Sequence, residues 1–143
     1  MASHHFLGTG LFSDALAAAA SRPEDLLDEI ERRVADSGLA VVERRAVPFP
    51  GGGFTLVWVL AESHLVLHYW AEEGYATIDL HICDYRTSNA AKARQLVDSL
   101  RRFCFVEGSD SWHEHRLDRP QGQPVEAARR LPADAPRLQS TDN

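Results

Sequence analysis

The sequence predicts an α+β fold, a two-layer sandwich in which helices cover one face of a mainly antiparallel β-sheet. Three β-rich segments follow one another in the middle of the chain, at residues 54–60, 64–70 and 75–83. The loop between the last two has four residues, the length of a hairpin connection. Two segments with a single apolar face at helical spacing, residues 23–37 and 90–102, are predicted to pack on this sheet.

Length, composition and charge limit the roles of the chain. Its 143 residues, 44% of them hydrophobic, suffice for one domain with a core. We expect that domain at residues 1–117 and a mobile tail at 118–143, where proline, arginine and polar residues replace the apolar pattern. The formal net charge of −6 comes from interspersed acids and bases, so a small molecule is a better partner than nucleic acid.

The cysteines and the apolar segments suggest a compartment. Cys83 and Cys104 form no disulfide framework, which fits a reducing environment. No apolar run reaches the roughly 18 residues of a membrane span, and no signal peptide is recognisable. We therefore expect a cytoplasmic protein without a membrane partner.

The first half of the chain begins with a predicted strand at residues 6–12, in which Gly8 and Gly10 mark close backbone approach. A helix is predicted from Pro23 to Ser37, with Ser21 and Glu24 as a capping box and Gly38 at its end. A strand at residues 39–47 follows, then a flexible glycine run. Residues 54–60 are predicted to form a strand that is buried on both faces or lies at the sheet centre.

In the second half, Thr87-Ser88-Asn89 is predicted to cap the helix at residues 90–102. A strand is expected at residues 103–106, and a short one at 111–117.

The hairpin at residues 64–83 permits a register prediction. If Trp70 faces Tyr75, then His64 faces His81 and Cys83 lies beside the Glu62-Ser63 bond. Alternation then gives the sheet a core face of leucines and isoleucines and a chemical face, which carries His64, His68, Asp79, His81 and Cys83.

These side chains allow two kinds of site. A nucleophile at Ser63, a base at His68 and an acid thiol at Cys83 would suit catalysis. Alternatively, His64, His68, His81 and Cys83 could converge on zinc, with His113 and His115 as further ligands. Because no clean ligand spacing accompanies them, we predict no metal, and we treat the His4-His5 pair as incidental.

One stretch carries a family resemblance. The run Glu62-Ser63-His64-Leu65-Val66-Leu67-His68-Tyr69-Trp70-Ala71-Glu72 is followed by Asp79-Leu80-His81-Ile82-Cys83-Asp84. It resembles the bacterial and archaeal S-adenosylmethionine decarboxylase proenzymes, whose pattern reads Glu-Ser-His-x-x-x-His-Thr-Trp-Pro-Glu and then Asp-x-x-x-Cys-Gly. The likeness covers about residues 4 to 108.

The resemblance implies a self-made cofactor. Ser63 would attack the carbonyl of Glu62, the chain would split into a β chain (1–62) and an α chain (63–143), and Ser63 would become a pyruvoyl group that forms a Schiff base with the substrate. His68 matches the histidine that removes the Ser63 α-proton, Thr55 stands where a serine assists processing, and Cys83 matches the proton donor. The resemblance also implies a homodimer with active sites near the subunit interface.

The substrate is less clear from the resemblance. Phe49, Trp70 and Glu72 match residues that hold S-adenosylmethionine. The departures from the pattern are Tyr69, Ala71, His81, Ile82 and Asp84, and the first strand lacks an expected acid.

Some relatives decarboxylate L-ornithine or L-arginine instead. Asp84 or Glu72 could pair with the distal cation of such a substrate, and Phe49 and Trp70 could stack on a guanidinium. The sequence slightly favours this basic amino-acid substrate in polyamine synthesis. One alternative is a genuine S-adenosylmethionine decarboxylase that makes the aminopropyl donor for spermidine. Another is an unprocessed, non-catalytic regulatory homologue.

Overall fold

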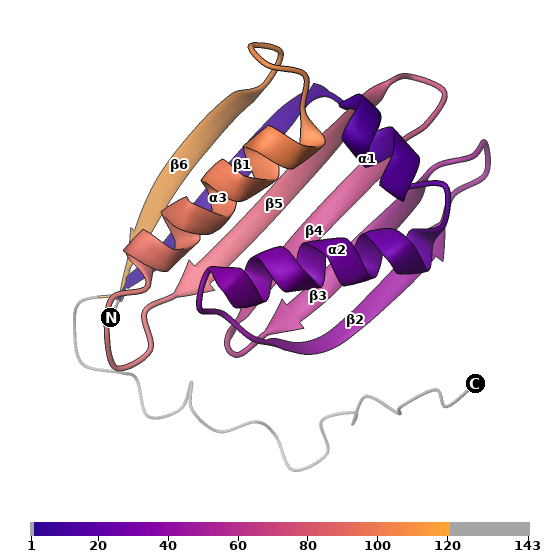
Figure 1. The fold of residues 1–143 in the computed structure, drawn as a ribbon. Coiled ribbons are helices and arrows are strands. Elements are labelled where there is room, and N and C mark those ends of the chain that lie inside the picture. The colour runs from indigo at the N-terminus through magenta and orange to yellow at the C-terminus, as the bar shows by residue number, and fades with distance from the viewer. Residues whose placement is uncertain (1, 121–143) are drawn as a thin grey trace, which may run out of the picture.

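A computed structural model describes residues 2–120. Six strands form one antiparallel sheet in the order β2-β3-β4-β5-β1-β6. The strands are β1 (Ala2–Leu11), β2 (Val41–Pro48), β3 (Phe54–Leu60), β4 (Ser63–Trp70), β5 (Tyr75–Cys83) and β6 (Ser111–Asp118). The first strand therefore lies between the fifth and the last, as Figure 1 shows.

Three helices cover one face of the sheet (Figure 1). They are α1 (Asp14–Ala19), α2 (Pro23–Asp36) and α3 (Ala90–Cys104). The apolar stripes of α2 and α3 meet alternate residues of the strands to form one core around the fully buried Trp58. The predicted two-layer α+β sandwich is confirmed.

The register prediction is confirmed as well. In the β4–β5 hairpin, His64 pairs with His81, His68 with Thr77 and Trp70 with Tyr75. The leucines and isoleucines of both strands are buried under the helices. On the opposite side, the histidine, aspartate and cysteine side chains of the predicted chemical face are only partly buried. We call this side, which no helix covers, the open face.

The first strand is longer than predicted. It begins at Ala2 rather than at Phe6, because residues 2–5 pair with β5 on one side and β6 on the other. The close approach at Gly8 is confirmed, since a Cβ there would lie 2.6 Å from the Trp112 ring. His4 and His5 are therefore residues of the sheet.

The helices differ from the prediction in three ways. The short helix α1 was not predicted, although Ser13 caps it by accepting a hydrogen bond from the Leu16 N–H. The predicted capping box is wrong, because Arg22 is the N-cap of α2 and the Ser21 hydroxyl donates to Ala18 instead. Asn89 is the N-cap of α3, but its side chain makes no capping hydrogen bond.

The strand predicted at residues 103–106 is also wrong. Helix α3 continues to Cys104, because Cys104 extends the buried stripe of Leu96, Val97 and Leu100. Phe105 makes only an isolated bridge to Phe12. The short strand expected at 111–117 is present as β6, and most of the predicted tail at 118–143 lies outside the described residues.

Candidate active site

Ser63 and Cys83 form the first of two clusters on the sheet. Ser63 is the first residue of β4, and its Oγ accepts a hydrogen bond of 3.0 Å from the backbone N–H of Cys83 at the end of β5. This contact joins residues 20 positions apart, as the hairpin register predicted. Because the N–H stabilises negative charge on Oγ, it favours Ser63 as a nucleophile.

Glu62 enters this cluster in a strained conformation. It lies in the tight turn between β3 and β4 with φ of +57°, in the left-handed region. For a residue with a side chain, this conformation costs on the order of 1–2 kcal/mol. The strained residue is therefore the one that directly precedes Ser63.

His81 lies beside the thiol of Cys83, with Nε2 4.0 Å from Sγ. Burial, and next the neighbouring His64 and His5, lower the pKa of His81, although Asp79 opposes this. The other cysteine, Cys104, is fully buried in the core, and burial raises the pKa of its thiol to about 12. Of the two thiols, only Cys83 is accessible for chemistry.

Thr55 and His68 form the second cluster. They face each other across β3 and β4, and Thr55 Oγ1 lies 2.8 Å from His68 Nδ1. Phe49 and Trp70 lie beside His68, with ring centroids 6.5 and 5.4 Å from the imidazole. These two rings are 5.8 Å apart and contact each other.

Glu72 belongs to the same end of the sheet. Its carboxylate lies close to Gly51, in the loop that carries Phe49. Three of the four residues predicted to bind substrate, Phe49, Trp70 and Glu72, are therefore grouped with His68 and not with Ser63.

The two clusters do not meet within one chain. Ser63 and His68 are both in β4, where five residue steps at about 3.3 Å each separate them by roughly 16 Å. No imidazole spans that distance. The structure thus brings Ser63 to Cys83 and Thr55 to His68, but it does not bring His68 to Ser63.

Asp84 lies just beyond the first cluster, and its carboxylate is already engaged. Oδ1 lies 3.0 Å from His4 Nε2 and accepts a hydrogen bond of 2.8 Å from the Asn89 N–H. Burial alone would raise the pKa of Asp84, but the hydrogen bonds from Asn89 and His4 outweigh it and lower the pKa. Asp84 also borders a hollow of about 350 Å³, which it shares with Arg86, Thr87 and Ser88.

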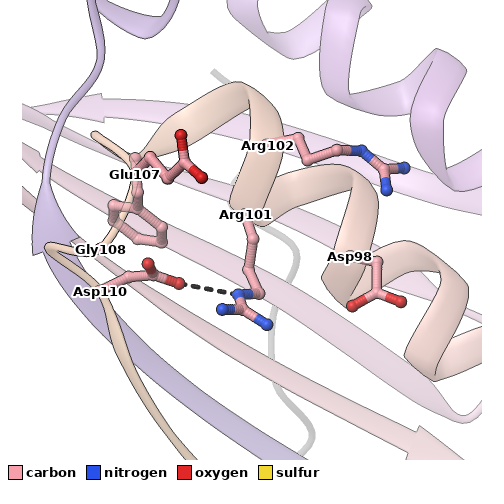
Figure 2. Close-up of a pocket in the computed structure, with 7 residues that line it drawn as sticks. Asp98, Arg101, Arg102, Glu107, Gly108 and Asp110 are labelled. Atoms are coloured by element: carbon pink, nitrogen blue, oxygen red, sulfur yellow. Dashed lines mark hydrogen bonds and ion pairs between the residues drawn. The ribbon is translucent and has the colours of Figure 1, made fainter.

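Two further hollows lie on opposite sides of the sheet, and one of them adjoins the second cluster. One of about 310 Å³ on the open face touches His68, Asp79 and His113. Another of about 470 Å³ lies on the helical side between α3 and the turn before β6, where Figure 2 shows Arg101 bound to Asp110.

Within residues 2–120, no group of three or more histidine, cysteine, aspartate or glutamate side chains is placed to hold a metal ion. No helix in this range is long and apolar enough to cross a membrane.

Two residues of the site were not predicted as site residues. His5 contacts Asp79, with Nε2 2.6 Å from Oδ1, and His81 contacts Cys83. The alternation of β5 already put His81 beside Cys83, so the sequence carried a signal for it. His5 carried none, because its neighbours come from the non-local pairing of β1 with β5.

Comparisons with known proteins give the family. The model of the S-adenosylmethionine decarboxylase family matches residues 12–103. The chain belongs to this family. Members that it resembles include an S-adenosylmethionine decarboxylase proenzyme of Aquifex aeolicus, 34% identical over 95 residues that cover 64% of this chain and 67% of that protein. An arginine decarboxylase proenzyme of Ignicoccus hospitalis is 34% identical over 86 residues, covering 58% and 60%.

Other family members match a shorter segment. An S-adenosylmethionine decarboxylase proenzyme of Pyrobaculum aerophilum is 44% identical over 52 residues, which cover 36% of this chain and 42% of that protein. The chain therefore spans about two fifths of the length of this curated relative. The crystal structure of the adenosylmethionine decarboxylase from Aquifex aeolicus superposes with a TM-score of 0.65 at 22% identity, covering 87% of this chain and 97% of that one. This likeness shows the shared fold.

Proposed function

We propose that this family member is a self-processing decarboxylase that makes a pyruvoyl group from Ser63. The observation that carries the proposal is the placement of Ser63 Oγ on the Cys83 N–H, directly after the left-handed Glu62. A nucleophile, a stabilising donor and a strained residue then lie together at one turn. These features favour self-cleavage of the bond between Glu62 and Ser63.

The proposed cleavage proceeds in balanced steps. Ser63 Oγ attacks the Glu62 carbonyl, the C–N bond breaks, and the peptide becomes an ester with a free amine on Ser63. A base then removes the α-proton of Ser63, the Cβ–Oγ bond breaks, and the Glu62 carboxylate leaves. Water replaces the nitrogen, which departs as ammonia, and residue 63 becomes a pyruvoyl group at the start of the chain 63–143.

The base in this scheme is His68, with Thr55 as its hydrogen-bonding partner. Since His68 lies roughly 16 Å from Ser63 along β4, it must act on a second copy of the chain. A two-fold dimer with facing open faces would place the Thr55–His68 cluster of one protomer over the Ser63–Cys83 cluster of the other. This separation supports the predicted homodimer.

In decarboxylation, the pyruvoyl group supplies an electron sink for the pair released when carbon dioxide leaves. The protein must then deliver one proton to the α-carbon of the substrate. Cys83 is suited to that task, because its thiol is partly exposed and adjoins Ser63. Both cysteines are free, which agrees with a cytoplasmic site of action.

We propose a basic amino acid, L-ornithine or L-arginine, as the substrate in polyamine synthesis. The departures from the family motif and the arginine decarboxylase proenzyme of Ignicoccus hospitalis support this choice. Asp84 remains the proposed partner of the distal cation through Oδ2, since Oδ1 is bound to His4 and Asn89.

S-adenosylmethionine is the second candidate. Phe49 and Trp70 contact each other beside His68, and Glu72 lies at the same end of the sheet. Aromatic faces with a nearby carboxylate suit a purine nucleoside with ribose hydroxyls. Most of the similar curated relatives described above carry the name of this activity.

The deciding experiment is the intact mass of the purified protein under denaturing conditions, with Ser63→Ala as the control. Two chains, residues 1–62 and a pyruvoyl-blocked 63–143, are expected from the natural sequence and one chain from the variant. Carbon dioxide release from each of the three substrates then identifies the reaction. A single chain after long incubation, with no carbon dioxide from any substrate, would overturn the proposal in favour of an unprocessed regulatory homologue.

A further inference from the structure

A row of four histidines crosses the open face. His115 on β6 pairs with His5 on β1, His5 pairs with His81 on β5, and His81 pairs with His64 on β4. The rings of His5 and His81 are stacked with centroids 5.3 Å apart, and those of His64 and His81 meet edge to face at 5.4 Å. His81 is the member that reaches Cys83.

One carboxylate links the neighbours of His81. Oδ1 of Asp79 lies 2.6 Å from Nε2 of His5 and 3.6 Å from Nε2 of His64. The side chain of His64 is 42% exposed, so this end of the row is open to water in the single chain. The titratable groups that face His81 are therefore His5 from β1, His64 from β4, and Asp79 and Cys83 from its own strand.

Decarboxylation creates a need that this row can meet. Each turnover replaces a C–COO⁻ bond by a C–H bond and consumes one proton. If the Cys83 thiol supplies that proton, a thiolate remains, and it must be protonated before the next turnover. Imidazole suits this transfer, because it can release a proton from one ring nitrogen and gain one at the other.

We propose that His81 returns the proton to Cys83 after each turnover, with His5, His64 and Asp79 resupplying it from solvent. The inference rests on the proposed role of Cys83 as proton donor. The His81 N–H bond breaks, the S–H bond forms, and a proton from the neighbouring groups restores His81. No oxidant or reductant takes part. Because His81 acts through Cys83, it is a positioning residue.

The environment of His81 favours this direction of transfer. Burial and two neighbouring imidazoles lower the pKa of His81, so its protonated form is a stronger acid than ordinary histidine. A protonated His81 therefore gives its proton readily to a nearby thiolate. The same environment keeps His81 mostly neutral near pH 7, so it does not trap the proton.

The first test uses an uncleaved chain, so it does not depend on decarboxylation. Iodoacetamide labelling of Cys83 is timed at pH 7 in Ser63→Ala, with and without His81→Ala. Cys104 should not be labelled, because it is fully buried. Loss of His81 should slow labelling about threefold or more, since a neutral His81 imidazole can accept the thiol proton as the sulfur is alkylated. The control His113→Ala removes a histidine from the same face and should leave the rate unchanged.

The second test uses the cleaved enzyme and its substrate. In His81→Ala, carbon dioxide from the first turnover should match the natural protein, whereas the steady-state rate should fall roughly 10- to 100-fold. Added imidazole should restore much of the steady-state rate, which a merely structural role would not allow. The His113→Ala enzyme should keep both rates.

The outcomes separate this inference from the proposed function. Equal labelling rates, or an unchanged steady-state rate in a cleaved His81→Ala enzyme, would overturn the role of His81. If His81→Ala is not cleaved, the labelling test alone decides. If the natural protein stays in one chain and releases no carbon dioxide, the proposed function fails, and the labelling rates still report the contact of His81 with Cys83.

Discussion

Thr55 Oγ1 lies 2.8 Å from Nδ1 of His68, and the two residues are direct partners in the β3–β4 register. Threonine occupies a position where the family pattern has serine, yet the hydroxyl still reaches the imidazole. The extra methyl group therefore leaves the hydrogen bond intact. This contact fixes one ring nitrogen of His68 and directs the other away from Thr55.

The first prediction concerns this hydroxyl. Thr55→Val keeps the shape of the side chain but removes the hydrogen bond, and we expect cleavage at 62/63 to slow about 10- to 100-fold. Thr55→Ser restores the family residue and should cleave at least as fast as the natural protein. Gel separation of the two chains over time measures both rates. Cleavage of Thr55→Val at the natural rate would remove Thr55 from the mechanism.

The second prediction tests whether the site is shared between protomers. Ser63→Ala and His68→Ala chains with different tags should each stay uncleaved when expressed alone. When they are co-expressed, the His68→Ala chain should be cleaved, because its Ser63 meets the His68 of the partner. The Ser63→Ala chain should stay whole throughout. If co-expression restores no cleavage, Ser63 and His68 act within one chain and the local structure must rearrange.

The third prediction concerns substrate choice. Asp84→Asn keeps an oxygen for the Asn89 N–H but removes the charge that would pair with a distal amine or guanidinium. We expect the kcat/KM for L-ornithine or L-arginine to fall about 10-fold or more, with little change for S-adenosylmethionine. The ratio between substrates is the measurement, because it is insensitive to a general loss of active enzyme. Equal losses for all substrates would assign Asp84 a structural role only.

The fourth prediction concerns stability in acid. Asp110 is only 6% exposed and accepts hydrogen bonds from Trp112 Nε1 at 2.7 Å and Arg101 Nε at 2.8 Å. Burial would raise the pKa of Asp110, but these two bonds outweigh it and lower the pKa below the ordinary 3.8. Its contribution to stability is therefore complete above pH 3.8 and is lost as the pH falls through the lower, folded-state value.

Asp110→Asn should consequently lower the free energy of unfolding by on the order of 1 kcal/mol at pH 7, and the difference should vanish in strong acid. Urea denaturation at several pH values measures it. Asp98→Asn is the matched control, since Asp98 lines the same hollow (Figure 2) but is exposed. A pH-independent difference would mean that the charge of Asp110 is not what stabilises the fold.

The hairpin around the candidate site was predictable from sequence because its information is local. A four-residue loop and strict alternation at residues 64–83 determine which side chains pair and which face the core. The contact of Ser63 with Cys83 followed from that register alone. The residue roles came from the family motif, which also lies within this short stretch.

The incorrect predictions have non-local or competing causes. The strand extension at residues 2–5 depends on two partners far away in the sequence, so His4 and His5 looked like an isolated pair. Residues 103–106 are as apolar as a strand, but the helical burial of Cys104 prevails. The separation of His68 from Ser63 was implicit in the predicted strand, because residues five apart in a strand cannot meet.

The order of the strands also determines how cleavage at 62/63 would affect the sheet. Cleavage at 62/63 would open only the turn between β3 and β4, and every ladder of the sheet would remain. Strand β1 of the N-terminal piece would still lie between β5 and β6 of the other piece. Its β3 would still pair with β4. The two products would thus share one sheet as two subunits. They could not dissociate without breaking the hydrogen bonds between β1 and the strands on both its sides.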